Sequence, residues 1–405
     1  MRTLRAFDAL ANPAYRVLWL GSNCIALGSW AERLAVGWLV LVQTESVLLS
    51  AATFGARSAP GIIAAPIGGA VADRFPRNRV LPIAALIRAC VIALMALVAL
   101  RGFSNPWPIF VLIAIEGVVN SFETPATQGL ITDIVPRHAR MNAISVHSVG
   151  GRAVGALGAL ASGVMAELVG IPTALLAATG AVLVGGAIVL LVPTVERTVR
   201  EAQEPIRRIF RDALTGLRSM VGIPTVSTLL GMAIMVEIFG FAYQAVMPAM
   251  ARDELHVAES GLGTLRFATG IGAVAGVAAL SFLGDFRRKG PLLLAITFAY
   301  GLGLVGVALS PNLAVAILLV TLVGAMAAGF DAMEWTLLQA TVPDDMRGRV
   351  IGGWIFAIGF GWVGHLAMGA VGEAVGVRWA IGGAGLVVML TGLLVLTVAP
   401  RLRRA

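Results

Sequence analysis

Charged residues are scarce in this sequence: they make up 13% of its 405 residues, against roughly 25% in a typical soluble domain. Hydrophobic residues account for 58% of the chain. A soluble helical protein would show an apolar stripe on one face of each helix, whereas here whole segments of about 20 residues are apolar on all sides. The composition therefore excludes a soluble fold and predicts an all-α integral membrane protein.

Cysteine and histidine are also rare, with two and four residues respectively. Cys24 and Cys90 both fall inside apolar segments, so we expect no disulfide framework. The histidines show no metal-ligand spacing, and no G-x-x-x-x-G-K-[ST] motif for nucleotide phosphates occurs. No combination of nucleophile and base stands out either. We therefore expect no metal, no cofactor, no enzymatic activity and no transport driven directly by ATP.

Twelve apolar segments account for most of the chain, and each is long enough to cross a bilayer. The connections between them are too short to hold a soluble catalytic or receptor domain. The segments cover residues 16–42, 47–72, 79–100, 107–131, 141–168, 172–193, 224–250, 260–283, 291–310, 312–338, 349–374 and 378–398.

The basic residues between these segments alternate in number from one connection to the next. One side of the membrane carries most of them, whereas the other has only Arg101, Arg252 and Arg378. By the positive-inside rule, both termini and the 195–223 connection face the cytoplasm. The net charge of +8 is thus a topology signal, and we expect a lipid bilayer rather than a nucleic acid around this chain.

Features of the first six segments recur in the last six at a spacing of about 205 to 212 residues. Such recurrence indicates a duplicated six-helix unit, and parallel repeats of this kind build transporters with a substrate site at mid-membrane. We predict two six-helix bundles, residues 1–194 and 224–405, joined by a cytoplasmic linker over 195–223. The recurring pairs are Glu32 with Glu237, Arg57 with Arg266, Asp73 with Asp285, and Glu123 with Asp331.

Eleven charged residues lie inside the apolar segments, where an unpaired charge costs roughly 2.5–3.5 kcal/mol. Six acids against five bases indicate extensive pairing, a water-filled cavity, or both. All six acids fall in the first, fourth, seventh and tenth segments. The acids are Glu32, Glu116, Glu123, Glu237, Asp331 and Glu334, and the bases are Arg33, Arg57, Arg88, Arg152 and Arg266.

Glu32 and Arg57 lie at the same depth in the first two segments, which predicts an ion pair between them. Arg33 is rotated by about 100° from Glu32 around the helix, so the two side chains cannot reach the same point. The face of Arg33 also carries Ser22 and Ser29. That face suits a polar cavity wall or a second partner for the arginine.

Polar residues form a stripe on the fourth segment, where their spacing of 4, 3 and 4 places them on one helical face. Such a stripe on an apolar helix favours a cavity; the alternative is that the acids are buried only to pair with arginines. We expect similar faces on the seventh and tenth segments, with aromatic side chains as an apolar wall or as packing. The candidates are Glu116, Asn120, Glu123 and Thr127, then Glu237, Phe241 and Gln244, then Asp331 and Glu334, and finally Trp30 and Trp335.

The stretch GGAVADRFPRNRV (68–80) is similar to the loop signature G-x-x-x-D-R-x-G-R-[RK], with Pro76 in place of one glycine. On this basis the chain resembles the Major Facilitator Superfamily over nearly its whole length. Three other stretches, within 12–46, 124–145 and 337–350, resemble its drug- and siderophore-exporter branch. The residues that match the signature are Gly69, Asp73, Arg74, Arg77 and Arg79.

This loop implies a charged gate on the cytoplasmic side, with Asp285 as the equivalent acid of the second half. A plain topology anchor is the alternative, because the arginines alone suffice for that purpose. At two positions the sequence differs from the patterns that proton antiporters of this superfamily carry. Ala156 replaces the proline of the fifth-segment antiporter signature, and the fourth segment has Glu116 near the place where many antiporters carry an arginine.

The resemblance implies a twelve-helix fold that works by alternating access on small-molecule substrates. It implies export of amphipathic compounds, such as drugs or siderophores, in exchange for protons. Uptake by symport is the alternative, since the same acids serve either direction, and a membrane enzyme or receptor is disfavoured by the short loops. We expect a monomer in the cytoplasmic membrane of a bacterium. The candidate proton carriers are Glu32, Glu123, Glu237 and Asp331.

Overall fold

The computed structural model of the chain is helical throughout its described part, in which no strand occurs. Each of the twelve apolar segments predicted from the sequence contains helix. Among the described residues, ten helices are long and apolar enough to cross a membrane, or eleven if the bent helix of the second segment counts as one span. The described residues are 9–103, 105–194, 223–283, 288–342, 353–354, 356–400 and 402, without the side chains of Ile62 and Asp73.

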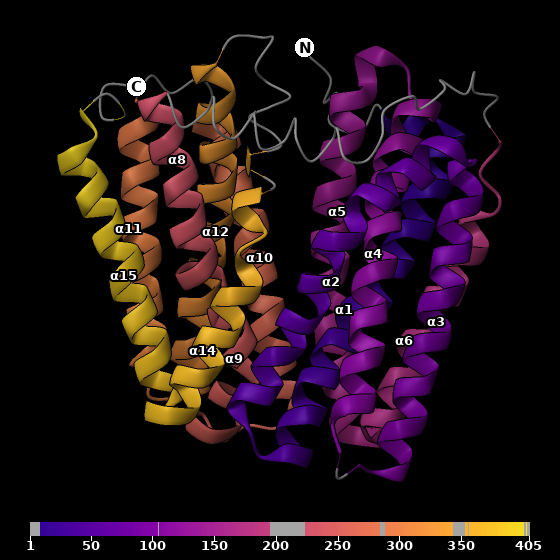
Figure 1. Cartoon of the computed structure of the whole chain (residues 1–405), viewed down its shortest axis with the longest axis horizontal. Coiled ribbons are helices and arrows are strands. Elements are labelled where there is room, and N and C mark those ends of the chain that lie inside the picture. Colours follow the sequence, from indigo (N-terminus) through magenta and orange to yellow (C-terminus); the bar gives the residue numbers. More distant parts are fainter. Residues whose placement is uncertain are drawn as a thin grey trace. The chain divides into compact units, whose positions relative to one another are not determined.

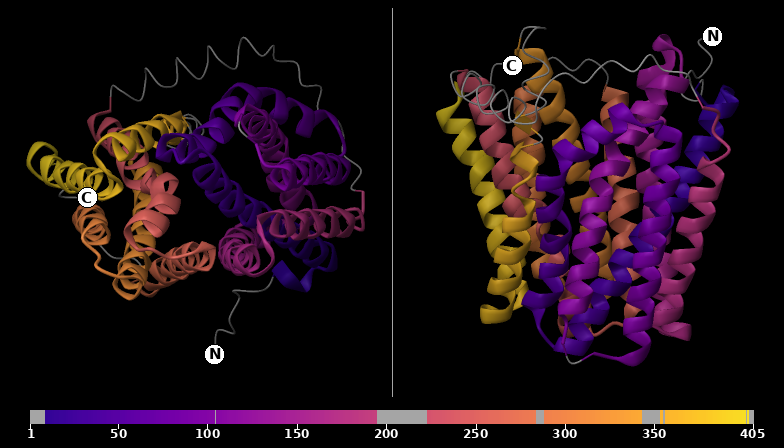
Figure 2. Two further views of the ribbon diagram at one scale, coloured as in Figure 1. Left: turned by 90° about the horizontal axis from the view of Figure 1, so that it is seen from below. Right: turned by 45° about the vertical axis from the view of Figure 1, so that its right-hand side comes forward.

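The first half of the chain forms six long helices (Figure 1). Helix α1 packs against α5 and α6, and α3 packs against α4 and α6. The further views of Figure 2 show these helices running side by side. Their bounds are Pro13–Thr44 for α1, Val47–Arg74 for α2, Arg77–Arg101 for α3, Trp107–Ile134 for α4, Arg140–Val169 for α5 and Ile171–Val189 for α6, with a 3₁₀ turn η2 at Arg137–Ala139.

In the second half, α11 packs against α12 and α15, and α14 packs against α15 and the middle of the seventh span. The seventh span is interrupted by two π-helical stretches, η3 and η4. The elements are α8 (Pro224–Met235), η3 (Val236–Phe241), α9 (Tyr243–Ala249), η4 (Met250–Glu254), α10 (Glu259–Leu283), α11 (Lys289–Ala308), α12 (Leu313–Thr341), α14 (Gly361–Val375) and α15 (Val377–Val398).

The chain divides into two compact units that largely follow the two halves. Unit 1 comprises residues 1–44, 56–203 and 258–267, and unit 2 comprises 45–55, 204–257 and 268–405. The first turns of α2 therefore group with unit 2, and the first turns of α10 group with unit 1. The linker predicted over 195–223 lies outside the described residues except for Ile223, so the bundle boundaries stay a prediction.

Two single-glycine hinges repeat between the halves. Gly170 joins α5 to α6 with φ at 91°, and Gly376 joins α14 to α15 with φ at 101°. A side chain is disfavoured in this left-handed region, so glycine ends one helix and permits the next to begin at once. The hinges lie at matching places, which is what a duplicated unit predicts.

Two glutamates next to these hinges make matching helix caps. Glu373 of α14 accepts hydrogen bonds from the Leu48 backbone N–H and the Ser46 hydroxyl, both at 2.8 Å, at the start of α2. Glu167 of α5 accepts one from the Ser260 backbone N–H at 3.2 Å, at the start of α10. A carboxylate at a helix N-terminus satisfies free backbone donors and favours the positive end of the helix dipole.

Candidate functional site

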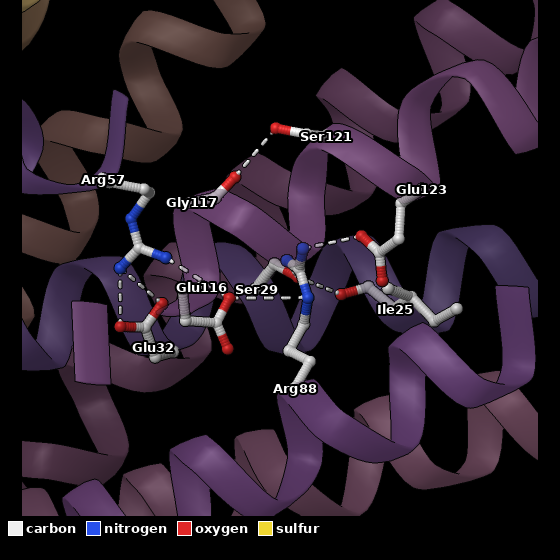
Figure 3. A network of polar contacts seen from close by, with 9 residues as sticks. All are labelled: Ile25, Ser29, Glu32, Arg57, Arg88, Glu116, Gly117, Ser121 and Glu123. Carbon is white, nitrogen blue, oxygen red and sulfur yellow. Dashed lines mark hydrogen bonds and ion pairs between the residues drawn. The ribbon is translucent and has the colours of Figure 1, made fainter. Parts of the chain in front are cut away.

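A continuous chain of buried carboxylates and guanidinium groups runs through unit 1 (Figure 3). Arg57 of α2 donates to both oxygens of Glu32 of α1, at 2.7 and 2.9 Å, and reaches Glu116 of α4 at 3.4 Å. Arg88 of α3 continues the chain, with Nε 3.5 Å from Glu116 and Nη2 2.6 Å from Glu123 of α4. The ion pair predicted between Glu32 and Arg57 is thus present, as one link of a longer network.

The network is almost entirely shielded from solvent. Glu32, Glu116 and Arg88 are at most 2% exposed. Burying charges is costly unless opposite charges and hydrogen bonds compensate for the lost hydration, and removing one partner then leaves an uncompensated charge. Because each of these acids contacts at least one arginine, the network satisfies that condition, and it ties four helices of unit 1 together.

A glycine determines how closely α2 approaches α4 at this point. A Cβ atom on Gly117 would lie 2.0 Å from the backbone carbonyl oxygen of Arg57, so only glycine fits. Ser121, one turn further along α4, donates to the backbone carbonyl of Gly61 on α2 at 3.1 Å. The close crossing therefore places Arg57 beside Glu116, which directly precedes Gly117 in the sequence.

The other end of the network borders a cavity of about 230 Å³ within unit 1. Glu123 and Arg88 belong to both the network and the cavity wall. The rest of the wall combines neutral polar groups with a few apolar side chains. It is formed by Ser22, Ile25, Ala26, Ser29, Trp30 and Arg33 of α1, Leu81 of α3, Asn120, Thr124, Thr127 and Gln128 of α4, His147 of α5 and Val189 of α6.

Five of the predicted site residues line this cavity. The face of Arg33 with Ser22 and Ser29 forms part of its wall, which is the first of the two outcomes expected for that face. Glu116 lies on the predicted stripe of α4 but takes part in the ion network rather than in the wall. The five residues are Trp30, Arg33, Asn120, Glu123 and Thr127.

Sequence reasoning did not identify Thr124, Gln128 and His147 as wall residues. Thr124 and Gln128 extend the polar face of α4. They follow Asn120 at intervals of four residues, so the helical spacing could have identified them. His147 carried no such signal, because it lies on α5 without polar neighbours at helical spacing. Its contribution depends on how α5 packs against α1, which residue spacing does not reveal.

The predicted acids of the second half lie together in unit 2. Glu237, Asp331 and Glu334 are close enough to repel one another electrostatically. Glu334 is buried and accepts a hydrogen bond from the Trp354 indole N–H at 3.1 Å. Glu237 packs against α14, where a Cβ on Gly361 would lie 2.6 Å from its Oε1.

The aromatic candidates of this half act as packing partners. Trp335 stacks edge-on against Trp354 with ring centroids 5.1 Å apart, and Phe241 packs edge-on against Tyr300 at 6.0 Å. The α-helical face predicted for Glu237, Phe241 and Gln244 needs correction, because residues 236–241 are π-helical. A π-turn adds a residue per turn and rotates everything that follows, which residue spacing alone does not indicate.

Arg77 is the buried member of the predicted gate loop. Its guanidinium lies 3.2 Å from the Asp133 carboxylate of α4, and its Nε–H donates to the Ala72 carbonyl at 3.0 Å. Arg74 and Arg79 are exposed, as an anchor on the membrane surface requires, and a Cβ on Gly69 would meet no atom within 4 Å. Asp285 and the Asp73 side chain lie outside the described residues. Asp133, which the sequence analysis did not single out, is the acid that holds Arg77.

The full-length relatives of this chain are transport proteins. It is 25% identical over 410 residues to the enterobactin exporter EntS of Shigella flexneri, which covers 97% of this chain and 93% of the relative. It is 21% identical over 339 residues to the staphyloferrin A transporter of Staphylococcus aureus, covering 82% of each chain.

Solved structures show the same fold. A D-xylose-proton symporter superposes with a TM-score of 0.70 at 16% identity, over 96% of this chain and 99% of that chain. The nucleoside transporter NupG superposes with a TM-score of 0.69 at 15% identity, over 96% of this chain and 98% of that chain. These identities are low enough that the likeness concerns the fold alone.

The chain also matches, over residues 4–404, the protein family described as transmembrane secretion effector. The match spans both halves and all twelve apolar segments. It agrees with the helical architecture and with the resemblance of the 68–80 loop. The chain therefore belongs to the transmembrane secretion effector family of the Major Facilitator Superfamily and is a multi-pass membrane transporter rather than an enzyme.

Proposed function

We propose that this protein exports a siderophore or a related amphipathic small molecule by alternating access, in exchange for protons. The observation that carries this proposal is the buried chain of glutamates and arginines in unit 1, which ends at a polar cavity. A structural ion network has no need of a cavity at its end. A coupling device needs both, since ion and substrate must influence one set of side chains.

Glu123 is the acid best placed for coupling among the candidates Glu32, Glu123, Glu237 and Asp331. One of its oxygens accepts a hydrogen bond from Arg88, whereas its Oε1 has no hydrogen-bond partner in the described part of the chain. Proton binding to Glu123 would remove one of the two carboxylate charges that hold Arg88. The network would then shift, and the cavity wall would change with it.

The relatives support export of a small molecule as the direction and cargo. The Shigella relative is an enterobactin exporter, and the Staphylococcus relative is a staphyloferrin A transporter whose name states no direction. We place the protein as a monomer in the cytoplasmic membrane of a bacterium, with both termini in the cytoplasm. The basic connections on one side support this orientation.

Transport into inside-out membrane vesicles tests the proposal. Vesicles that contain the full chain should accumulate iron-free enterobactin or staphyloferrin A when their lumen is acid, and a protonophore should abolish this accumulation. E254Q, at a half-buried ion pair with Arg378 in unit 2 and away from the unit 1 network, serves as the control that retains transport. Accumulation in right-side-out vesicles only would support symport instead, and accumulation of neither compound in either orientation would contradict siderophore transport.

A further inference from the structure

Arg33 differs from the other arginines of the unit 1 site because it forms no ion pair at contact distance with any acid in the described part of the chain. Arg57 and Arg88 each contact two glutamates. Arg33 donates no hydrogen bond to any residue in the described part of the chain, and its Nε lies buried without a partner. A cation without a partner inside a membrane protein is costly, and such residues mark substrate or ion paths.

The guanidinium of Arg33 is held in place by an aromatic ring. Its Cζ lies 4.9 Å from the centroid of the Trp30 ring, within the range of a cation–π contact. A guanidinium that stacks by its face keeps its edge N–H groups available, and this edge matches the two oxygens of a carboxylate. Trp30 therefore orients Arg33 without using its hydrogen-bond donors.

The surroundings of Arg33 can complete an anion site. Both Arg33 and Trp30 line the 230 Å³ cavity, together with the hydroxyl and amide groups of Asn120, Thr124 and Gln128. Glu123, the acid among the residues that line this wall, is already bonded to Arg88 at 2.6 Å. The Nδ1 atom of His147 on the same wall is also buried without a hydrogen-bond partner in the described part of the chain.

The size of the cavity limits what it can hold. Its volume of about 230 Å³ lies below the roughly 300–1,000 Å³ of the pockets that usually hold drug-sized ligands. The cavity of unit 1 therefore fits one acidic group with the ring or short chain that carries it. The remaining part of a larger ligand would lie outside this cavity.

We propose that Arg33, stacked on Trp30, binds a carboxylate of the transported molecule, so that the substrate class is organic acids. This inference rests on the proposed function only in taking the cavity as the substrate site. Binding to Arg33 requires neither a proton gradient nor transport. A neutral compound would leave the guanidinium without a partner, and the site would select against it.

Equilibrium binding to the purified full chain tests this assignment, with benzoate and its neutral isostere benzamide as probes. Isothermal titration should detect benzoate but not benzamide. R33Q should bind benzoate about tenfold more weakly or worse, since a hydrogen bond between charged groups typically contributes 1.5–3 kcal/mol. R33K should also bind more weakly than the native chain, because an ammonium group lacks the paired donors.

The matched control is R252Q, at an arginine that pairs with Asp253 on the exposed end of η4. It should bind benzoate as the native chain does. Thermal unfolding of R33Q at the same temperature as the native chain guards against a folding defect in that variant. Equal binding of both probes, no binding of benzoate to the native chain, or unchanged binding to R33Q would overturn the assignment.

The outcomes separate this inference from the proposed function. Benzoate binding at Arg33 in a protein that moves no siderophore would leave the anion site standing and contradict siderophore export. Proton-driven transport of a compound without an acidic group, unchanged in R33Q, would support the transporter and overturn the anion site.

Discussion

The intramembrane acids have different surroundings in the two units. In unit 1, the acids Glu32, Glu116 and Glu123 each contact an arginine. In unit 2, Glu237, Asp331 and Glu334 are close enough to affect one another electrostatically, and no ion pair between Glu237 or Glu334 and an arginine or lysine is found in the described part of the chain. Acids thus occur on matching helices of the two halves, whereas ion pairs with arginine accompany them in unit 1.

The helix crossings show where the difference arises. Gly117 of α4 meets the carbonyl of Arg57 on α2, and Gly324 of α12 meets the carbonyl of Thr269 on α10, with Cβ distances of 2.0 and 2.1 Å. The crossing is the same in both units, but threonine stands where unit 1 has arginine. Arg266, which residue spacing matches with Arg57, lies one turn earlier and groups with unit 1.

The largest effect is expected from removing a base of the network. R88M leaves Glu116 with Arg57 alone and Glu123 without its arginine, and breaking a buried pair in this way typically costs about 3–5 kcal/mol. The detergent-purified R88M protein should therefore unfold at a much lower denaturant concentration than the native chain. E334Q in unit 2 is the comparison and should shift unfolding little, because its partner is the neutral Trp354. Equal shifts in both variants would contradict the contrast between the units.

The next largest effect concerns the two crossings. G117A and G324A each force apart a backbone contact that leaves no room for a methyl group, and overpacking typically costs about 1–3 kcal/mol. G117A should destabilise the protein more than G324A, because it also moves Arg57 away from Glu116. G69A has open space around it and serves as the control in the same thermal unfolding series. A G324A variant that unfolds at lower temperature than G117A would show that the network adds nothing to this crossing.

The smallest effect is expected at the paired helix caps, where the units are alike. E373Q and E167Q each weaken a carboxylate cap, and such changes typically cost on the order of 1 kcal/mol. E373Q should cost more, since Glu373 accepts two hydrogen bonds at 2.8 Å and Glu167 accepts one at 3.2 Å. E259Q, in the first turn of α10 beside Ser260, is the matched control. Thermal unfolding of the three variants measures these costs, and an E167Q protein that unfolds at a lower temperature than E373Q would contradict the predicted order.

The fold could be predicted from the sequence because only a few kinds of structure can span a lipid bilayer. Twelve apolar runs with alternating basic connections leave little besides a helical bundle. The Glu32–Arg57 pair followed from equal depth on adjacent helices. Arg88 was recognised as an intramembrane charge, but its contact with Glu123 depends on the rotation of α3 against α4.

Other features of the site depend on backbone geometry that single residues do not signal. The π-helical stretch around Glu237 changes which side chains share a face. Ser22 and Ser29 predicted either a polar wall or a second partner for Arg33, but its stacking on Trp30 and its lack of an ion pair within the described residues appear only in three dimensions.

The central claim is that Glu123, where the network meets the cavity, carries the coupling proton. Proteoliposomes separate coupling from movement, because counterflow exchange of labelled siderophore needs no proton gradient, whereas accumulation against a gradient does. E123Q should retain counterflow and lose accumulation driven by a pH gradient, while E334Q should retain both. An E123Q protein that still concentrates its substrate under a pH gradient would contradict the account.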